Sequence, residues 1–176
     1  MSFMDDLAAL ANEALGSQGS NLAEAGTILS KATSLPKLLA AKEEATRWSR
    51  AVSFAFTDDL PAEEANAVAL ASRNEGPADA LRHCCLAAML ARDLGYTDAL
   101  EVLVAHEMNA AWGSPASQMD LFNNAVGIEI GVRMKAASDL DLQMATMDAF
   151  LQGRLRVLDH ANGDKLVPTR SLTFGR

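Results

Sequence analysis

The chain has 176 residues, of which 49% are hydrophobic, 22% charged and 5% aromatic. This length suits one domain, or a domain with a helical appendage, and the hydrophobic fraction excludes a disordered or collagen-like chain. The net charge of −8 argues against a nucleic-acid partner, whose binding needs a basic surface. No apolar run approaches the roughly 18 residues of a transmembrane segment. The acidic start, Met1–Asp6, is unlike a secretory signal, which begins with basic residues.

The first 73 residues are expected to form four helices, the first of which is set apart by a linker. The predicted helical segments are 3–15, 22–32, 36–56 and a stretch that ends near residue 73. Residues 16–21 are rich in Gly and Ser, which is typical of a linker. Pro36 suits the first turn of a helix, and Trp48 and Phe54 of that helix are expected to face the core. The start signal of the fourth helix is Asp58–Pro61 with the acids that follow.

Each of the next two helices is apolar on every side, which indicates that it is buried all round. The first covers residues 78–94, and Gly95 suits its C-terminal end. Thr97–Asp98 caps the second, in which residues 100–105 again surround the axis with apolar atoms. Cys84 and Cys85 are adjacent in the first helix, so they cannot form an ordinary loop-closing disulfide. We expect both to stay reduced and packed.

The rest of the chain is expected to form helices over 117–136 and 138–158, followed by an irregular tail at 161–176. No apolar and polar alternation of strand length is evident. We therefore expect an all-α fold: a single compact helical domain with two buried central helices and an N-terminal helical extension. The predicted organisation is an N-terminal helix and linker at 1–20, a helical domain of catalytic type at 21–160, and the tail.

Ionisable residues stand at the ends of the two helices that are expected to be buried, where an unpaired charge is costly. Asp79 and His83 are four residues apart and share a helix face, so the carboxylate could fix the tautomer of the imidazole. Arg82 could pair with a carboxylate from elsewhere in the chain. The second helix ends in His106 and Glu107. An ion pair and a helix-end histidine are the structural interpretations of these residues.

The following helix carries a stripe of small and polar residues. Its members are Asp120, Asn124, Gly127 and Gly131, which lie at helical spacing. The amides of Asn123 and Asn124 can donate to a substrate carbonyl or orient a carboxylate. The two glycines permit the close approach of another backbone or of a ligand.

Three blocks of this chain resemble a known bacterial family. The blocks are Asp79-Ala80-x-Arg82-His83, Ala105-His106-Glu107 and Met119-Asp120-Leu121-x-Asn123-Asn124-x-x-Gly127. Together they resemble domains found at the ends of polymorphic toxins and in stand-alone secreted effectors, over about residues 77–131. The chain departs from the usual pattern at Phe122, where a polar aromatic residue is typical.

The resemblance implies a helical catalytic domain that is used against competing bacteria. It also implies a cognate immunity protein as partner and a substrate in the cell envelope. The protein would be made in the bacterial cytoplasm, exported without a classical signal peptide, and active in the periplasm of the target cell.

Three functions fit these residues. In the favoured one, Glu107 is the general acid of a hydrolase that cleaves the glycan of peptidoglycan, and Asp120 or the Asn123–Asn124 pair stabilises the sugar cation or places a water. In the second, a divalent metal bound by His83, Asp120 and either His106 or Glu107 activates water for phosphodiester or phospholipid hydrolysis. In the third, the polar cluster is structural and the protein is a helical interaction or pore-forming module.

The favoured function defines a set of site residues. Its predicted catalytic residues are Glu107, His83 and Asp120, and its predicted substrate-binding residues are Arg82, His106, Asn123 and Asn124. It requires no cofactor, whereas the second function requires a divalent metal. Both depend on one geometric condition: the imidazole of His83, the acid of Glu107 and the amide of Asn124 must meet in a single hollow that solvent can reach.

Overall fold

The computed structural model describes residues 34–57, 60–107 and 113–171. In this part of the chain six α-helices and one two-stranded sheet are present: α3 (Leu35–Val52), α4 (Ala62–Ala71), α5 (Pro77–Leu94), α6 (Tyr96–Glu107), α7 (Pro115–Arg133), α8 (Asp139–Leu151), β1 (Arg156–Asp159) and β2 (Lys165–Pro168). The predicted all-α class is confirmed. The helices predicted at 3–15 and 22–32 lie outside the described residues. None of the described helices combines the length and the apolar character needed to cross a membrane.

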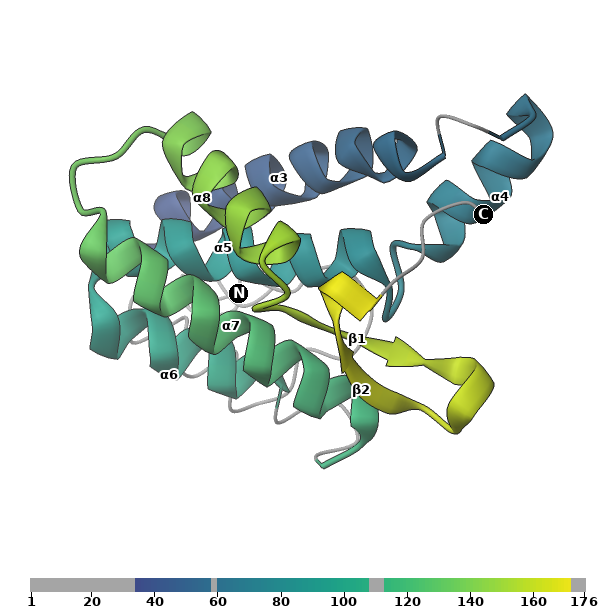
Figure 1. The fold of residues 1–176 in the computed structure, drawn as a ribbon. Coiled ribbons are helices and arrows are strands. Elements are labelled where there is room, and N and C mark those ends of the chain that lie inside the picture. Colours follow the sequence, from purple (N-terminus) through teal and green to yellow (C-terminus); the bar gives the residue numbers. More distant parts are fainter. Residues whose placement is uncertain (1–33, 58–59, 108–112, 172–176) are drawn as a thin grey trace, which may run out of the picture.

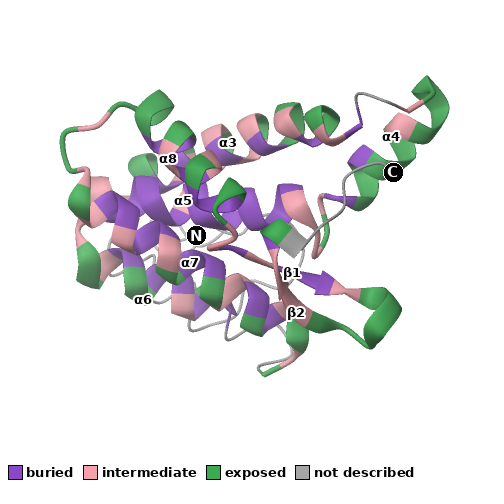
Figure 2. Cartoon of the chain, in the orientation of Figure 1, coloured by how far each residue is buried: buried purple, intermediate pink, exposed green. Residues whose placement is uncertain are grey.

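Helix α5 forms the centre of the domain, between α3 and α8 on one side and α6 and α7 on the other (Figure 1). Pro77 opens this helix, and Gly95 ends it with a φ of 86°. Nearly all of its length is buried (Figure 2), as its continuous apolar sequence predicts. Cys84 and Cys85 are free and buried there, and burial raises the pKa of the Cys84 thiol to about 12.

Helix α6 differs from the prediction of a helix that is buried all round. Val102, Leu103 and Ala105 are buried, but Leu100 is 36% exposed and Glu101 is exposed. The reason is its position at the edge of the described part of the domain, where its main contacts are with α5 and α7 (Figure 1). Leu100 lines a groove between α6 and α7 that is described below.

Two glycines seat α7 directly on α5. A Cβ atom at Gly127 would overlap the carbonyl oxygen of Cys84, and one at Gly131 would overlap that of Ala88. The glycine stripe therefore serves the approach of another backbone and not of a ligand. This contact brings the first turns of α5 against α7.

The chain beyond α8 corrects two predictions. The helix expected over 138–158 ends at Leu151, and the chain turns at Gly153 with a φ of 72°. Strands β1 and β2 then form an antiparallel hairpin in which Arg156 pairs with Pro168 and Asp159 with Lys165. Part of the tail expected to be irregular is thus a strand. Four-residue strands are too short for a clear alternation of apolar and polar residues.

The start of the described chain is close to the prediction, with one exception. Trp48 packs against the core, as expected. Phe54, however, is 45% exposed, because the α-helix ends at Val52 and a 3₁₀ turn over Ser53–Phe56 redirects the chain. The Arg73 guanidinium lies over the Phe54 ring at 5.5 Å.

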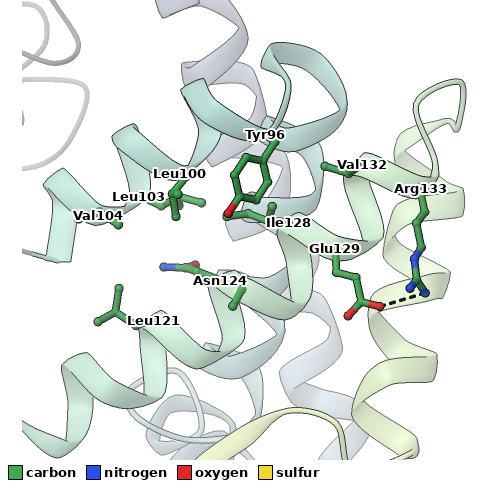
Figure 3. A pocket seen from close by; sticks show the side chains of 11 residues that line it. Tyr96, Leu100, Leu103, Val104, Leu121, Asn124, Ile128, Glu129, Val132 and Arg133 are labelled. Carbon is green, nitrogen blue, oxygen red and sulfur yellow. Dashed lines mark ion pairs between the residues drawn. The ribbon is translucent and has the colours of Figure 1, made fainter.

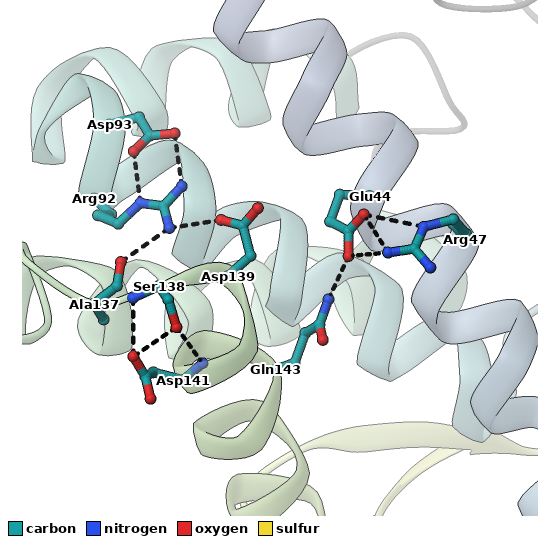
Figure 4. Close-up of polar contacts among 9 residues, drawn as sticks. All are labelled: Glu44, Arg47, Arg92, Asp93, Ala137, Ser138, Asp139, Asp141 and Gln143. Carbon is teal, nitrogen blue, oxygen red and sulfur yellow. Dashed lines mark hydrogen bonds and ion pairs between the residues drawn. The ribbon is translucent and has the colours of Figure 1, made fainter.

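Polar contacts fix the end of the domain at which α5 finishes (Figure 4). Arg92 donates to the carbonyl of Ala137 at 3.1 Å and to Asp139 at 2.6 Å, which ties the α7–α8 loop to α5. Gln143 on α8 donates to Glu44 on α3 at 2.7 Å. The opposite end of α5, which carries Asp79 and His83, has no part in these contacts.

Candidate functional site

An imidazole lies between two carboxylates where the first turns of α5 face α7. His83 Nε2 is 3.6 Å from Asp79 Oδ1, one turn earlier on α5, and 3.3 Å from Asp120 Oδ1 on α7. One ligand atom from each of the three residues lies within 4.8 Å of the other two. Asp79 and His83 are buried, and Asp120 is partly buried. We refer to Asp79, His83 and Asp120 as the Asp–His–Asp cluster.

Arg82 joins this cluster from the same helix. Its guanidinium pairs with Asp79 Oδ1, and its Nη2 lies 2.9 Å from His83 Nε2. The other Asp79 oxygen accepts from the backbone N–H of Glu75 at 2.7 Å. The partner of Arg82 is therefore on its own helix and not elsewhere in the chain. Since arginine can only donate, His83 Nε2 is the acceptor and its proton is on Nδ1.

Burial and neighbouring charges keep both His83 and Asp120 neutral at neutral pH. Burial, followed by the positive charge of Arg82, lowers the pKa of His83 to about 3. Burial, followed by the charges of Asp79 and Glu107, raises the pKa of Asp120 to about 8. A neutral imidazole is the form that binds metal ions, and an ion would displace the proton of Asp120.

The last two residues of α6, His106 and Glu107, contribute unequally to this region. Glu107 is 2% exposed, and its charge acts on Asp120. His106 is exposed, although its charge still acts on His83. His106 does not belong to the Asp–His–Asp cluster, and its predicted role in substrate binding stays a prediction.

The two adjacent asparagines have different environments. Asn124 is 2% exposed, and its amide makes no hydrogen bond of standard geometry within the described residues. Its side chain nevertheless interacts with His83, as a hydrogen-bond partner that raises the pKa of that imidazole. Asp120 Oδ1 likewise makes no hydrogen bond there. Buried polar atoms without partners are rare in folded proteins, and here they gather beside one imidazole.

Asn123 has a structural contact, and its predicted role in substrate binding stays a prediction. Its amide donates to the carbonyl of Arg156 and accepts from the N–H of the same residue, both at 2.9 Å. Asn123 thereby attaches β1 to α7. Phe122 supports the same attachment, because the Arg156 guanidinium lies over its ring at 4.4 Å.

A groove of about 380 Å³ runs between α6 and α7, and Asn124 lies in its wall (Figure 3). Aliphatic side chains such as Leu103, Leu121 and Ile128 form most of its wall, and the ion pair of Glu129 with Arg133 lies at its far end. Asn124 lines this groove and belongs to the surroundings of His83. It is therefore the link between the groove and the Asp–His–Asp cluster.

The expected meeting of His83, Glu107 and Asn124 is found in part. Asn124 and Glu107 act on the cluster through His83 and Asp120 respectively. Among them only Asn124 lines the α6–α7 groove. Trp112 and the rest of residues 108–112, which follow Glu107, lie outside the described residues.

The sequence predicts for Asp79 only the orientation of His83. In the structure Asp79 also offers a ligand atom, as His83 and Asp120 do. The spacing of four residues between the two was the available signal. It could not tell an orienting carboxylate from a ligand.

The family of the chain is established by one match. The model of a family described as Domain of unknown function (DUF6973) matches residues 26–154. This stretch includes all helices from α3 to α8 and every residue of the Asp–His–Asp cluster. Neither a curated protein nor a solved structure matches the chain. Because the match spans more than half of the sequence, the chain belongs to the DUF6973 family.

Proposed function

We propose that this protein is a hydrolase that uses a divalent metal ion bound by Asp79, His83 and Asp120. The observation that carries the proposal is the cluster itself, in which three ligand atoms lie within 4.8 Å of one another. Two carboxylates and a neutral imidazole are a donor set that zinc and similar ions accept. The buried amide of Asn124 acts on the same imidazole and is a further polar group that a ligand there could contact.

The arrangement of charges is compatible with an ion. Arg82 supplies one positive charge to two carboxylates and a neutral imidazole. Ionisation of Asp120 would leave one negative charge uncompensated. A bound divalent ion would compensate this charge. The ion competes with Arg82 for His83 Nε2, since the guanidinium already donates to that atom.

Such an ion would lower the pKa of a bound water and turn it into a nucleophile near neutral pH. Glu107, which is buried and whose charge acts on Asp120, would accept the proton of that water. The amide of Asn124 can donate to a substrate oxygen from the wall of the α6–α7 groove. Phosphodiester hydrolysis fits these roles. Compared with the second function considered above, Asp79 takes the place of His106.

The proposal is tested by titrating the chelator-treated protein with Zn²⁺ or Mn²⁺ in a calorimeter. One ion per chain is expected, with binding lost in Asp120→Asn. The matched control is Asp148→Asn, which changes an exposed carboxylate on α8. Hydrolysis of bis(p-nitrophenyl) phosphate should stop with chelator and return with metal. Absence of ion binding, or hydrolysis that resists the chelator, would contradict the proposal.

Cleavage of the peptidoglycan glycan is the second candidate, and one observation favours it. Asp120 and Glu107 act on each other electrostatically, and the pKa of Asp120 is about 8. Asp120 would therefore be the general acid, in place of Glu107. Digestion of purified peptidoglycan with mass analysis of the products tests this alternative. Lysis that survives a chelator but is lost in Asp120→Asn would favour it over the metal-dependent scheme.

The biological role proposed with either chemistry is that of an antibacterial effector, and it rests on the resemblance of the three sequence blocks. Expression of the chain in the periplasm of a susceptible bacterium should be toxic, and Asp120→Asn should relieve the toxicity. Co-expression with the adjacent gene would test for an immunity protein. If the toxicity persists in the variant, the third function, a non-catalytic interaction or pore-forming module, gains support.

A further inference from the structure

A second cavity, of about 420 Å³, lies on the other side of Arg82, between the end of α3, the turn after α4 and the start of α5. Three arginines line it, namely Arg50, Arg73 and Arg82, together with neutral residues such as Thr46 and Asn74. No carboxylate is among the described residues that line it. This is unusual in a chain with 23 acidic and 15 basic residues. We refer to this space as the arginine cavity.

The described residues compensate little of the positive charge of the cavity. Arg73 donates to the hydroxyl of Ser53 at 3.2 and 3.1 Å and lies over the ring of Phe54, and both of these partners are neutral. Arg50 extends from the last turn of α3 and makes no ion pair with any described residue. Among the described residues, only Arg82 of the three is paired with a carboxylate, that of Asp79. Arg50 and Arg73 are thus held beside an open space without a carboxylate partner in the part of the chain that the structure describes.

Guanidinium groups suit a particular class of anion. Their planar, fixed donors match the oxygens of phosphate and carboxylate, and several of them together favour an anion with more than one negative charge. The cavity volume exceeds that of a phosphate group and leaves room for an attached alcohol. Electrostatic attraction would also guide such an anion to one place on an otherwise acidic protein.

Arg82 connects the arginine cavity with the Asp–His–Asp cluster. It lines the cavity, and its Nη2 lies 2.9 Å from His83 Nε2. We propose that the arginine cavity binds the phosphate group of a phosphate ester. Its assignment to the substrate rests on the proposed metal-dependent hydrolysis, because a phosphate held there lies one side chain away from the cluster. Binding of phosphate by Arg50 and Arg73 does not require that assignment.

Calorimetric titration with inorganic phosphate and with glycerol 3-phosphate tests the proposal. A chelator is present throughout, so that the outcome is independent of the metal ion. The variants are Arg50→Gln, Arg73→Gln and the double substitution. Arg47→Gln is the matched control, because Arg47 is an exposed arginine on the same helix that pairs with Glu44 and does not line the cavity. Arg50 has no side-chain partner among the described residues, so its substitution should leave the fold intact.

Each single substitution should weaken phosphate binding about tenfold, which is the value of one charge-assisted hydrogen-bond partner. The control should bind as the wild type does, and acetate should bind more weakly than phosphate. Tighter binding of glycerol 3-phosphate than of inorganic phosphate would indicate a lipid headgroup as the source, and equal binding would indicate a simple phosphate ester. Equal affinity in Arg50→Gln, Arg73→Gln and Arg47→Gln, or a preference for acetate, would overturn the proposal.

The test is separable from that of the proposed function. Phosphate binding without metal binding would keep the arginine cavity and remove the metal-dependent scheme. Metal binding without phosphate binding would keep the metal-dependent scheme and remove the arginine cavity as a phosphate site. In the metal-loaded protein, Arg50→Gln should raise KM for a phosphodiester while kcat stays within about twofold, since Arg50 is not a member of the Asp–His–Asp cluster.

Discussion

Replacement of Asp120 by asparagine should make the metal-free protein more stable at neutral pH. The ordinary pKa of this carboxyl is 3.8, and in the folded protein it is about 8. The causes are burial and then the charges of Asp79 and Glu107, opposed by Arg82 and assisted by Glu75. At pH 7 the protein must keep a proton that the unfolded chain would release. This costs about 4 kcal/mol, at roughly 1.4 kcal/mol per pKa unit.

The sign of the pH dependence follows from the direction of the shift. Between pH 3.8 and about 8 the folded state binds more protons at Asp120 than the unfolded state does. The stability of the wild type therefore falls as the pH rises through this range. An asparagine has no proton to bind, so the stability difference between Asp120→Asn and the wild type should grow with pH by roughly 1.4 kcal/mol per unit. The lowered pKa of His83 acts in the opposite direction below about pH 6.5, but it is common to both proteins.

The assay is urea unfolding followed by circular dichroism at four pH values from 4.5 to 7.5, with chelator present. Asp148→Asn, which removes an exposed carboxylate on α8, is the control and should show a small difference that is the same at each pH. Saturating metal should then stabilise the wild type and not Asp120→Asn, because the variant lacks a ligand. A difference that does not change with pH, or a wild type that is the more stable protein at pH 7.5, would refute the assignment of a raised pKa to Asp120.

Three further substitutions or reagents test the structure around the Asp–His–Asp cluster. Gly127→Ala places a Cβ atom against the carbonyl of Cys84 and 2.8 Å from the Ala87 Cβ. The gain of about 1 kcal/mol in helix propensity is too small to offset this overlap. Urea unfolding should therefore show a net loss of about 2 kcal/mol in the free energy of unfolding. A stabilised variant would contradict the close contact of α5 and α7. Asn123→Ala leaves the N–H and carbonyl of Arg156 without their partner. Unfolding should show a loss of about 2–3 kcal/mol in stability, while metal binding at saturating metal is retained. Lost metal binding at full stability would show instead that Asn123 belongs to the metal site. Ellman's reagent should react with Cys84 only after urea is added, because the thiol is buried and its pKa is about 12, and rapid labelling of the native protein would show that α5 is accessible.

Most helices of this domain could be predicted from local patterns. Pro36 and Gly95 mark a helix start and a helix end in the sequence, and α3 and α5 follow these marks closely. The burial of α5 is also evident in its continuous apolar run. The burial of α6 is not, because a similar apolar run lies at the edge of the domain and keeps Leu100 exposed. Periodicity records which residues avoid water and not how many neighbours a helix has.

The hairpin after α8 could not be predicted for a related reason. Strands of four residues carry too little alternation to be distinguished from the end of a helix. Their place is set by long-range contacts, in which Asn123 on α7 holds Arg156 and the Glu75 carbonyl accepts from the N–H of Leu158 at 3.1 Å. Neither contact is visible in the sequence of the strands themselves.

In the candidate site, too, some contacts follow from the sequence and others only from the tertiary packing. The pairing of Asp79 with His83 follows from their spacing of four residues on one helix. The choice of Asp120 over His106 as the next neighbour of His83 follows from the packing of α5 on α7, which Gly127 and Gly131 make close. Asn123 and Asn124 are adjacent, so their side chains point about 100° apart around the helix. One reaches a strand and the other faces the imidazole, because only the position of the surrounding elements decides which direction leads to a partner.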